Sequence, residues 1–147
     1  MKIKIMAIFL ILFLLPVIFA GCAGEKTGEN IEFETLAAGY NSQQVEPSYY
    51  VIKDEERLKE VWDKIGEGNA AEVDFNQNMV IAVFQGEQST GGFEIKVNEI
   101  VETKENLNVY VKEIVPDPSD IVTQALSSPY HIVELERIEK KVEFITE

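Results

Sequence analysis

The stretch Met79-Val80-Ile81-Ala82-Val83-Phe84 is apolar at all six positions. Successive side chains of a β-strand point to opposite faces of a sheet, so a strand without polar positions has to be covered on both faces. The stretch therefore predicts a central strand, around which the rest of the domain is arranged.

Downstream of this run the pattern predicts further strands. Apolar and polar residues alternate in segments 93–101 and 107–111, which is typical of strands with one solvated face. A short polar turn separates the two segments, so we expect an antiparallel hairpin. Residues 116–120 contain two prolines, which cannot continue a ladder of hydrogen bonds, and they predict a long connection. Strands are predicted again at 130–135 and 142–145.

Upstream of the run the pattern predicts two strands and one helix. Alternation over residues 31–39 and the aromatic and β-branched stretch 49–52 indicate strands. Residues 54–65 predict an amphipathic helix, since Asp54 can cap its amino end and apolar residues recur at helical spacing before Gly66. The sequence therefore predicts an α+β fold, a mostly antiparallel β-sheet or open barrel with one amphipathic helix at about residues 54–65.

The first 21 residues differ from the rest of the chain. Lys2 and Lys4 precede a long apolar run, and no acidic residue occurs before Glu25. Secretory signals have this order of charged, apolar and small residues, so we predict a signal peptide at residues 1–21. An uncleaved membrane anchor is the alternative, because the run is close to the shortest apolar segment that spans a bilayer as a helix.

Cys22 is the only cysteine in the chain. The stretch Ala20-Gly21-Cys22 resembles the lipobox of bacterial lipoproteins, in which the cysteine is acylated and becomes the first residue. The resemblance implies a lipid anchor at Cys22, and the small and polar residues 22–30 would form a lipidated flexible tether. The expected location is the cell membrane, with the domain facing away from the cytoplasm.

The charge balance excludes one class of partner. The 147 residues contain 13 Lys plus Arg and 26 Asp plus Glu, which gives a formal net charge of −13 at pH 7. Nucleic acids are bound through clustered basic side chains that neutralise phosphates, so we predict no nucleic-acid partner. With a single cysteine, the chain cannot form a disulfide within itself.

Two predicted connections carry residues suited to binding a protein partner. The first contains Ser89, Thr90, Gly91, Gly92 and Phe93, and the second, after Ser127, contains Ser128, Pro129 and Tyr130. Adjacent glycines can adopt positive φ and allow another chain close to the backbone, which suits a binding loop, although a hairpin turn has the same requirement. Our hypothesis is that the two loops converge at one edge of the sheet and form the partner-binding site.

No catalytic, metal or cofactor site is predicted, and we expect no enzymatic activity. His131 is the only histidine, and no residue at a suitable spacing would complete a general base or a metal site. Asp117, Ser119 and Asp120 place oxygen atoms close together, as calcium sites do, but the stretch lacks the glycine and the final acid of an EF-hand. It is interpreted as an acidic, proline-rich turn.

From about residue 31 onward, the chain resembles the PrcB C-terminal domain family, named for a lipoprotein subunit of a protease complex. The resemblance rests on Val51-Ile52, the helix with Trp62, Asp74-Phe75, Met79 to Val83, Thr90-Gly91-Gly92-Phe93-Glu94-Ile95 and Ser128-Pro129-Tyr130-His131-Ile132-Val133. It implies a PrcB C-terminal-like domain at residues 31–147, an extracytoplasmic setting and association with a protease, and it implies no catalytic residues. The two loops also resemble the wedge of chagasin-type cysteine protease inhibitors, whose third inhibitory loop is missing here.

Two functions from different classes follow as expectations. The first is a lipid-anchored extracytoplasmic module that binds a protein partner, with a secreted protease that it would bind, tether or restrain as the candidate. The alternative is a lipoprotein that binds a small ligand or a metal and serves a membrane transporter. A deep apolar pocket would favour the alternative.

Overall fold

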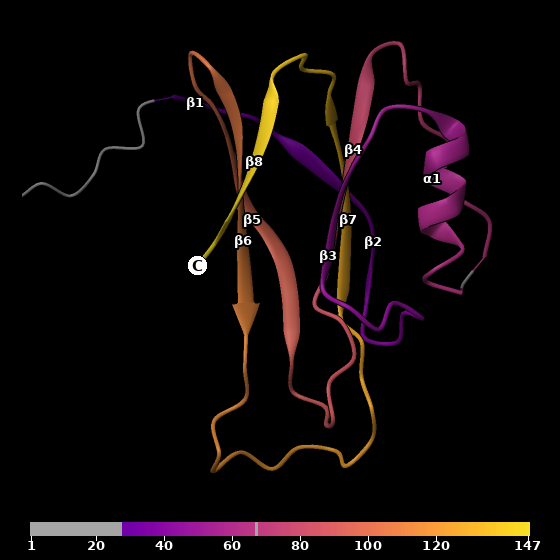
Figure 1. The fold of residues 1–147 in the computed structure, drawn as a ribbon, viewed down its shortest axis with the longest axis vertical. Helices are drawn as coiled ribbons and strands as arrows, with labels where there is room; N and C mark the ends of the chain where they lie inside the picture. Colours follow the sequence, from indigo (N-terminus) through magenta and orange to yellow (C-terminus); the bar gives the residue numbers. More distant parts are fainter. Residues whose placement is uncertain (1–27, 67) are drawn as a thin grey trace, which may run out of the picture.

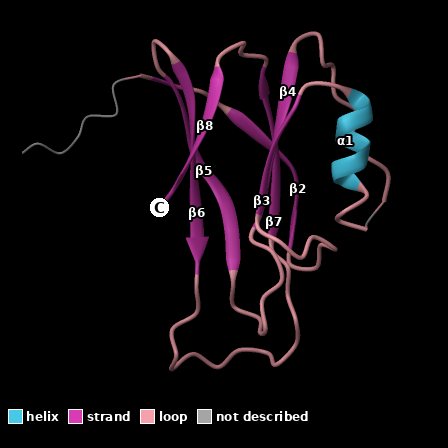
Figure 2. Ribbon diagram, viewed as in Figure 1, coloured by secondary structure: helices cyan, strands magenta, loops and turns pink. Residues whose placement is uncertain are grey.

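The fold has three layers, which Figure 1 and Figure 2 show side by side. A computed structural model describes residues 28–66 and 68–147. The first layer is a four-stranded sheet with strand order β1-β5-β6-β8, called sheet A here. The second is a four-stranded sheet with order β2-β7-β4-β3, called sheet B, and a single helix, α1, covers its outer face.

Sheet B contains the predicted central strand. Its strands are β2 (Phe33–Gly39), β7 (Tyr130–Glu136), β4 (Asn78–Phe84) and β3 (Ser48–Ile52). All neighbouring pairs are antiparallel, and β4 lies between β7 and β3. Alternate side chains of β4 face sheet A and the helix, and those from Met79 to Phe84 are fully buried. The prediction of a strand covered on both faces is confirmed.

Sheet A contains the predicted hairpin and the last strand of the chain. Its strands are β1 (Glu29–Asn30), β5 (Glu94–Glu102), β6 (Asn106–Ile114) and β8 (Lys141–Thr146). β5 and β6 are antiparallel, whereas β8 runs parallel to β6, because the chain crosses from sheet B to sheet A after β7. A flexible tether was predicted at residues 22–30. Its last two residues, Glu29 and Asn30, instead form β1, because their backbone pairs with β5.

The main hydrophobic core lies between the two sheets. It is formed by Met79, Ile81, Val83, Ile95, Val97, Ile100, Leu107, Val109, Val111, Val133 and Leu135. These side chains come from β4, β5, β6 and β7, so the core joins strands that are far apart in the sequence. Burial of this apolar surface is the main favourable contribution to folding.

The helix α1 (Glu55–Trp62) packs its apolar side chains on the outer face of sheet B. As predicted, Asp54 caps it, because its carboxylate accepts a hydrogen bond from the backbone N–H of Arg57 at 2.8 Å. The helix ends at Trp62, three residues earlier than expected. Ile65 is still buried, but it belongs to a turn that leads to Gly66, whose φ of +69° suits glycine.

The observed architecture confirms the predicted fold class. The domain is α+β, with one short helix and mostly antiparallel strands at the predicted places. The strands form two packed sheets and do not close into a barrel.

Candidate functional site

Three connections meet at one end of the two sheets, and we call this surface the loop end. It consists of residues 40–47 between β2 and β3, 85–93 between β4 and β5, and 115–129 between β6 and β7. In Figure 1 it is the lower end of the molecule. The two loops that were expected to converge therefore do so, because both belong to this surface.

Hydrogen bonds of Ser128 connect residues 115–129 to residues 40–47. Its N–H donates to the carbonyl of Tyr40 at 2.6 Å, and its hydroxyl donates to the carbonyl of Gln44 at 2.7 Å. The N–H of Ser42 donates to the Ser128 carbonyl at 3.0 Å, and the two serine hydroxyls lie 2.6 Å apart. Buried polar groups are costly unless they are hydrogen-bonded, so these contacts explain how a serine fits this buried position.

Hydrogen bonds of Ser127 connect the same segment to residues 85–93. Gln88 and Ser127 exchange two backbone hydrogen bonds, of 2.7 and 3.0 Å, and the Ser127 hydroxyl donates to the carbonyl of Thr90 at 2.6 Å. The N–H of Gly91 also donates to the carbonyl of Thr123 at 2.9 Å. The loop end is therefore one hydrogen-bonded unit, which reduces the conformational entropy that binding a partner would remove.

The two adjacent glycines of this surface serve different purposes. Gly92 has a φ of +88°, so it needs the conformational freedom of glycine. Gly91 does not have a positive φ, and there the limit is space, because the hydroxyl of Thr123 occupies the position that a side chain would take. The predicted requirement for positive φ is thus confirmed at Gly92 alone.

The loop end carries an exposed apolar surface, which we call the apolar patch. It consists of Tyr40, Val45, Val115, Ile121 and Leu126, each more than half exposed. Within residues 28–66 and 68–147, these are the only large apolar side chains with such exposure. A hollow of about 510 Å³ opens beside Tyr40 and Leu126. Exposed apolar side chains that lie together mark interaction sites in soluble domains, and Tyr40 and Leu126 line the same hollow.

The predicted residues of the first loop lie at this hollow or next to it. Ser89 and Gly92 are exposed, and Thr90, Gly91 and Phe93 are partly exposed. Phe93 and the two glycines line the hollow. The first loop is therefore accessible to a partner.

The predicted residues of the second loop lie in the interior. Ser128, Pro129 and Tyr130 are buried, so they support the loop end from within and present no contact surface. This corrects the predicted site at these positions, because the stretch is held by hydrogen bonds to the neighbouring connections. The prediction named none of the five residues of the apolar patch, and two of these, Tyr40 and Leu126, line the hollow. A leucine in a polar, proline-containing connection is a usable signal for Leu126, whereas the sequence around Tyr40 offers none.

The loop end is acidic. Its three connections contain Glu46, Glu87, Asp117 and Asp120, all exposed, and no lysine or arginine. The Asp117 carboxylate accepts the hydroxyl and the N–H of Ser119 at 2.6 and 2.9 Å, and the hydroxyl bond in particular lowers the pKa of that carboxyl. The Asp120 carboxylate accepts the N–H of Asp117 at 2.8 Å. The predicted acidic turn is therefore built from its own hydrogen bonds.

His131 lies in β7, buried between the two sheets. Its Nδ1 accepts the backbone N–H of Val97 at 3.0 Å, and its Nε2 lies 2.9 Å from the hydroxyl of Thr35. Because Nδ1 is the acceptor, the neutral ring carries its proton on Nε2 and donates it to Thr35. Val97 lies beside the register shift in β5, so the imidazole joins the irregular part of sheet A to sheet B.

The stability of the fold should depend on the ionisation of His131. Burial lowers the pKa of His131 below its ordinary value of 6.5; Lys96 acts in the same direction, and Glu94 opposes it. The unfolded chain then takes up a proton at a higher pH than the folded protein, so the free energy of unfolding should fall as the pH decreases below about 6.5. Chemical denaturation at a series of pH values between about 5 and 7.5 measures this slope.

The variant His131→Phe is the control for that measurement, because the chain has no other histidine. It should remove the slope in this range. It should also lower the free energy of unfolding at neutral pH by roughly 1–3 kcal/mol, since the N–H of Val97 loses its partner. A slope that persists in the variant would contradict the assignment to His131.

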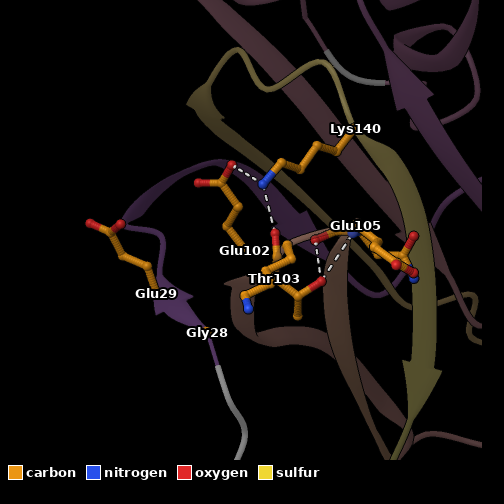
Figure 3. Close-up of a pocket in the computed structure, with 8 residues that line it drawn as sticks. Gly28, Glu29, Glu102, Thr103, Glu105 and Lys140 are labelled. Atoms are coloured by element: carbon orange, nitrogen blue, oxygen red, sulfur yellow. Dashed lines mark hydrogen bonds and ion pairs between the residues drawn. The ribbon is translucent and has the colours of Figure 1, made fainter.

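A second hollow lies at the opposite end of sheet A, beside β1 and the β5–β6 turn (Figure 3). Its volume is about 860 Å³, and it is open to solvent and lined by charged and polar side chains. The Lys140 ammonium pairs with Glu102 at 2.8 Å and donates to the carbonyl of Thr103 at 2.6 Å. This hollow is not the deep apolar pocket that would favour the small-ligand alternative. Across the described ranges, no three His, Cys, Asp or Glu side chains are grouped as a metal site.

The predicted signal peptide at residues 1–21 and the predicted lipidation site Cys22 lie outside the described residues, as do residues 23–27 of the tether. In the part of the chain that is described, no helix has the length and apolar character needed to cross a membrane.

Comparison with known protein families yields a match. Residues 79–136 match the family model described as PrcB C-terminal, which confirms the resemblance inferred from the sequence over these residues. The matched segment runs from β4 to the end of β7 and includes two of the three connections of the loop end. No curated protein and no solved structure matches the chain.

Proposed function

We propose, from the match of residues 79–136 to the PrcB C-terminal family, that this chain is a lipid-anchored, extracytoplasmic interaction module whose loop end binds another protein. The observation that supports binding is the apolar patch. Its residues come from two separate connections of the loop end, and nothing in the described chain covers them. Tyr40 and Leu126, one from each connection, line the same hollow. A protein partner would remove this apolar surface from water.

The acidic side chains of the loop end indicate the chemistry of the partner. A loop end with exposed apolar side chains and four exposed carboxylates fits a partner surface that combines apolar side chains with lysine or arginine. A partner side chain would enter the hollow between Phe93 and Leu126. The module would act by binding and not by catalysis, and the family resemblance favours a secreted protease as the partner.

The proposed location is the outer face of the membrane, with Cys22 as the site of the lipid anchor. The order of residues in 1–21 supports export, and the single cysteine after Ala20-Gly21 supports acylation. Two acyl chains would hold the module stably at the membrane, where one chain would bind only reversibly.

Leu126→Glu is the variant that tests the loop end. It places a charge at the hollow of the loop end, so capture of the partner from the native cell envelope should fall roughly tenfold or more, as for an interface residue of large effect. Full-length tagged proteins, compared by quantitative mass spectrometry, provide the measurement. Lys104→Glu is the matched control, because this exposed residue lies in the turn at the opposite end and its change adds more negative charge.

The proposal requires one protein that is captured by the wild type and by Lys104→Glu but not by Leu126→Glu. Both variants must first show the wild-type denaturation midpoint, so that loss of folding is not mistaken for loss of binding. Equal capture by all three proteins would reject the loop end as the binding surface.

A further inference from the structure

The outer edge of β8 is an unpaired row of backbone hydrogen-bonding groups. β8 is an edge strand, and its only neighbour is β6. The N–H of Glu147 donates to Val111 of β6, so by alternation the odd residues of β8 direct their backbone groups toward β6. The even residues Val142, Phe144 and Thr146 therefore direct theirs outward, and no backbone hydrogen bond to another described strand involves them.

The other sheet edges are less suited to pairing. β1 has two residues, and β3 has five. β2 has a register shift between Thr35 and Ala37, and such bulges bend an edge away from a neighbouring strand. β8 is regular over six residues, with its apolar side chains Val142 and Phe144 packed on the core. Among the four edges, it is the longest one without a register shift.

We infer that β8 pairs with β8 of a second copy of this chain, antiparallel and centred on Phe144, so that sheet A continues across a two-fold axis. In this register Val142 of one copy lies opposite Thr146 of the other, and Phe144 lies opposite itself. All three outward N–H groups of each copy then donate to carbonyls of the other copy, in the narrow pairs of an antiparallel ladder. A two-fold arrangement of this kind is closed and adds no further copies.

The charges along β8 select this register. It places Lys141 opposite Glu147 of the second copy, twice per dimer, and opposite charges across strands are stabilising. If the pairing were centred on residue 143, Glu143 of one copy would lie opposite Glu143 of the other. If it were centred on residue 145, Glu143 would lie opposite Glu147. Both registers set like charges against each other. The register centred on Phe144 thus satisfies both the backbone groups and the charges.

Charge reversal tests the register. Lys141→Glu should raise the dimer dissociation constant roughly tenfold, because two attractive cross-strand pairs become repulsive. Glu147→Lys should do the same, and the double variant Lys141→Glu/Glu147→Lys should restore the wild-type value. The measurement is sedimentation equilibrium of the full-length protein in a density-matched detergent, with the detergent included because of the apolar residues 5–15.

Thr146→Pro tests the backbone pairing independently of charge. The substitution removes one outward N–H at a position where the fold does not use it, so the monomer should stay folded while the dimer weakens. Thr146→Val is its matched control, since it keeps the N–H and should keep the dimer. A wild-type protein that stays monomeric at every concentration would overturn the inference. A dimer that is unaffected by Thr146→Pro, or that the double charge variant fails to restore, would also overturn it.

Discussion

Replacing Phe84 with alanine should lower the free energy of unfolding by about 3–5 kcal/mol, the largest effect expected for a single side chain in this domain. Phe84 is the last residue of β4, and its side chain is completely buried on the helix side of sheet B. Its ring centroid lies 5.8 Å from that of Tyr50 on β3 and 6.0 Å from that of Tyr130 on β7. The variant therefore leaves a cavity between three strands and removes two aromatic contacts.

Phe144→Ala is the matched control for this prediction. The Phe144 ring also contacts an aromatic ring, that of Tyr49 at 5.1 Å, but it lies at the edge of the core and is only partly buried. Its removal should cost no more than about half as much. Denaturant unfolding, followed by the fluorescence of Trp62, the only tryptophan, measures both variants. Equal losses would mean that Phe84 has no special place in the packing of sheet B.

Gly86→Ala should lower the free energy of unfolding by roughly 2–4 kcal/mol. Gly86 has a φ of +79°, which is strained for alanine. A β-carbon there would also lie 2.6 Å from the carbonyl oxygen of Val45 and 2.9 Å from the backbone nitrogen of Pro47. Because both are backbone atoms, the β2–β3 connection would have to move, and the variant should distort the loop end as well as destabilise it.

Gly68→Ala separates the two causes. Gly68 also has a positive φ, of +60°, but a β-carbon there would meet no heavy atom within 4 Å. It should therefore cost only about 1 kcal/mol, the strain of the backbone alone. Thermal unfolding of the two variants gives the comparison. If Gly68→Ala were as destabilising as Gly86→Ala, the contact with residues 45–47 would not explain the loss.

The elements of the fold could be predicted from the sequence because each has a local signal. The apolar run 79–84 and the alternation in 93–101 and 107–111 indicate strands, and Asp54 marks the start of the helix. The division of the strands into two sheets could not be predicted, because pairing depends on contacts between distant residues. The parallel pairing of β8 with β6 is one example, since nothing within residues 141–146 specifies it.

The connections that form the candidate site could be predicted from the sequence, but the side chains that they expose could not. The glycines and the prolines identify the two connections, and the structure brings these connections together. Which side chains are exposed depends on hydrogen bonds between connections. Ser128 is polar and buried because its hydroxyl and backbone groups bind residues 40–44, whereas Leu126 is apolar and exposed because no other segment covers it. Neither outcome follows from residue type.

The position of β4 between β3 and β7 also determines how the chain folds over time. β3 precedes β4 and is separated from it by residues 53–77, whereas β7 follows only after β5, β6 and the long connection 115–129. Until β7 has been synthesised and has paired, one edge of β4 is open, and six of its seven residues are apolar. Such segments are prone to intermolecular pairing. Folding dominated by distant strand pairing is slow, so the nascent chain has a prolonged period in which it can aggregate. The strand that organises the finished domain is therefore its main hazard during folding.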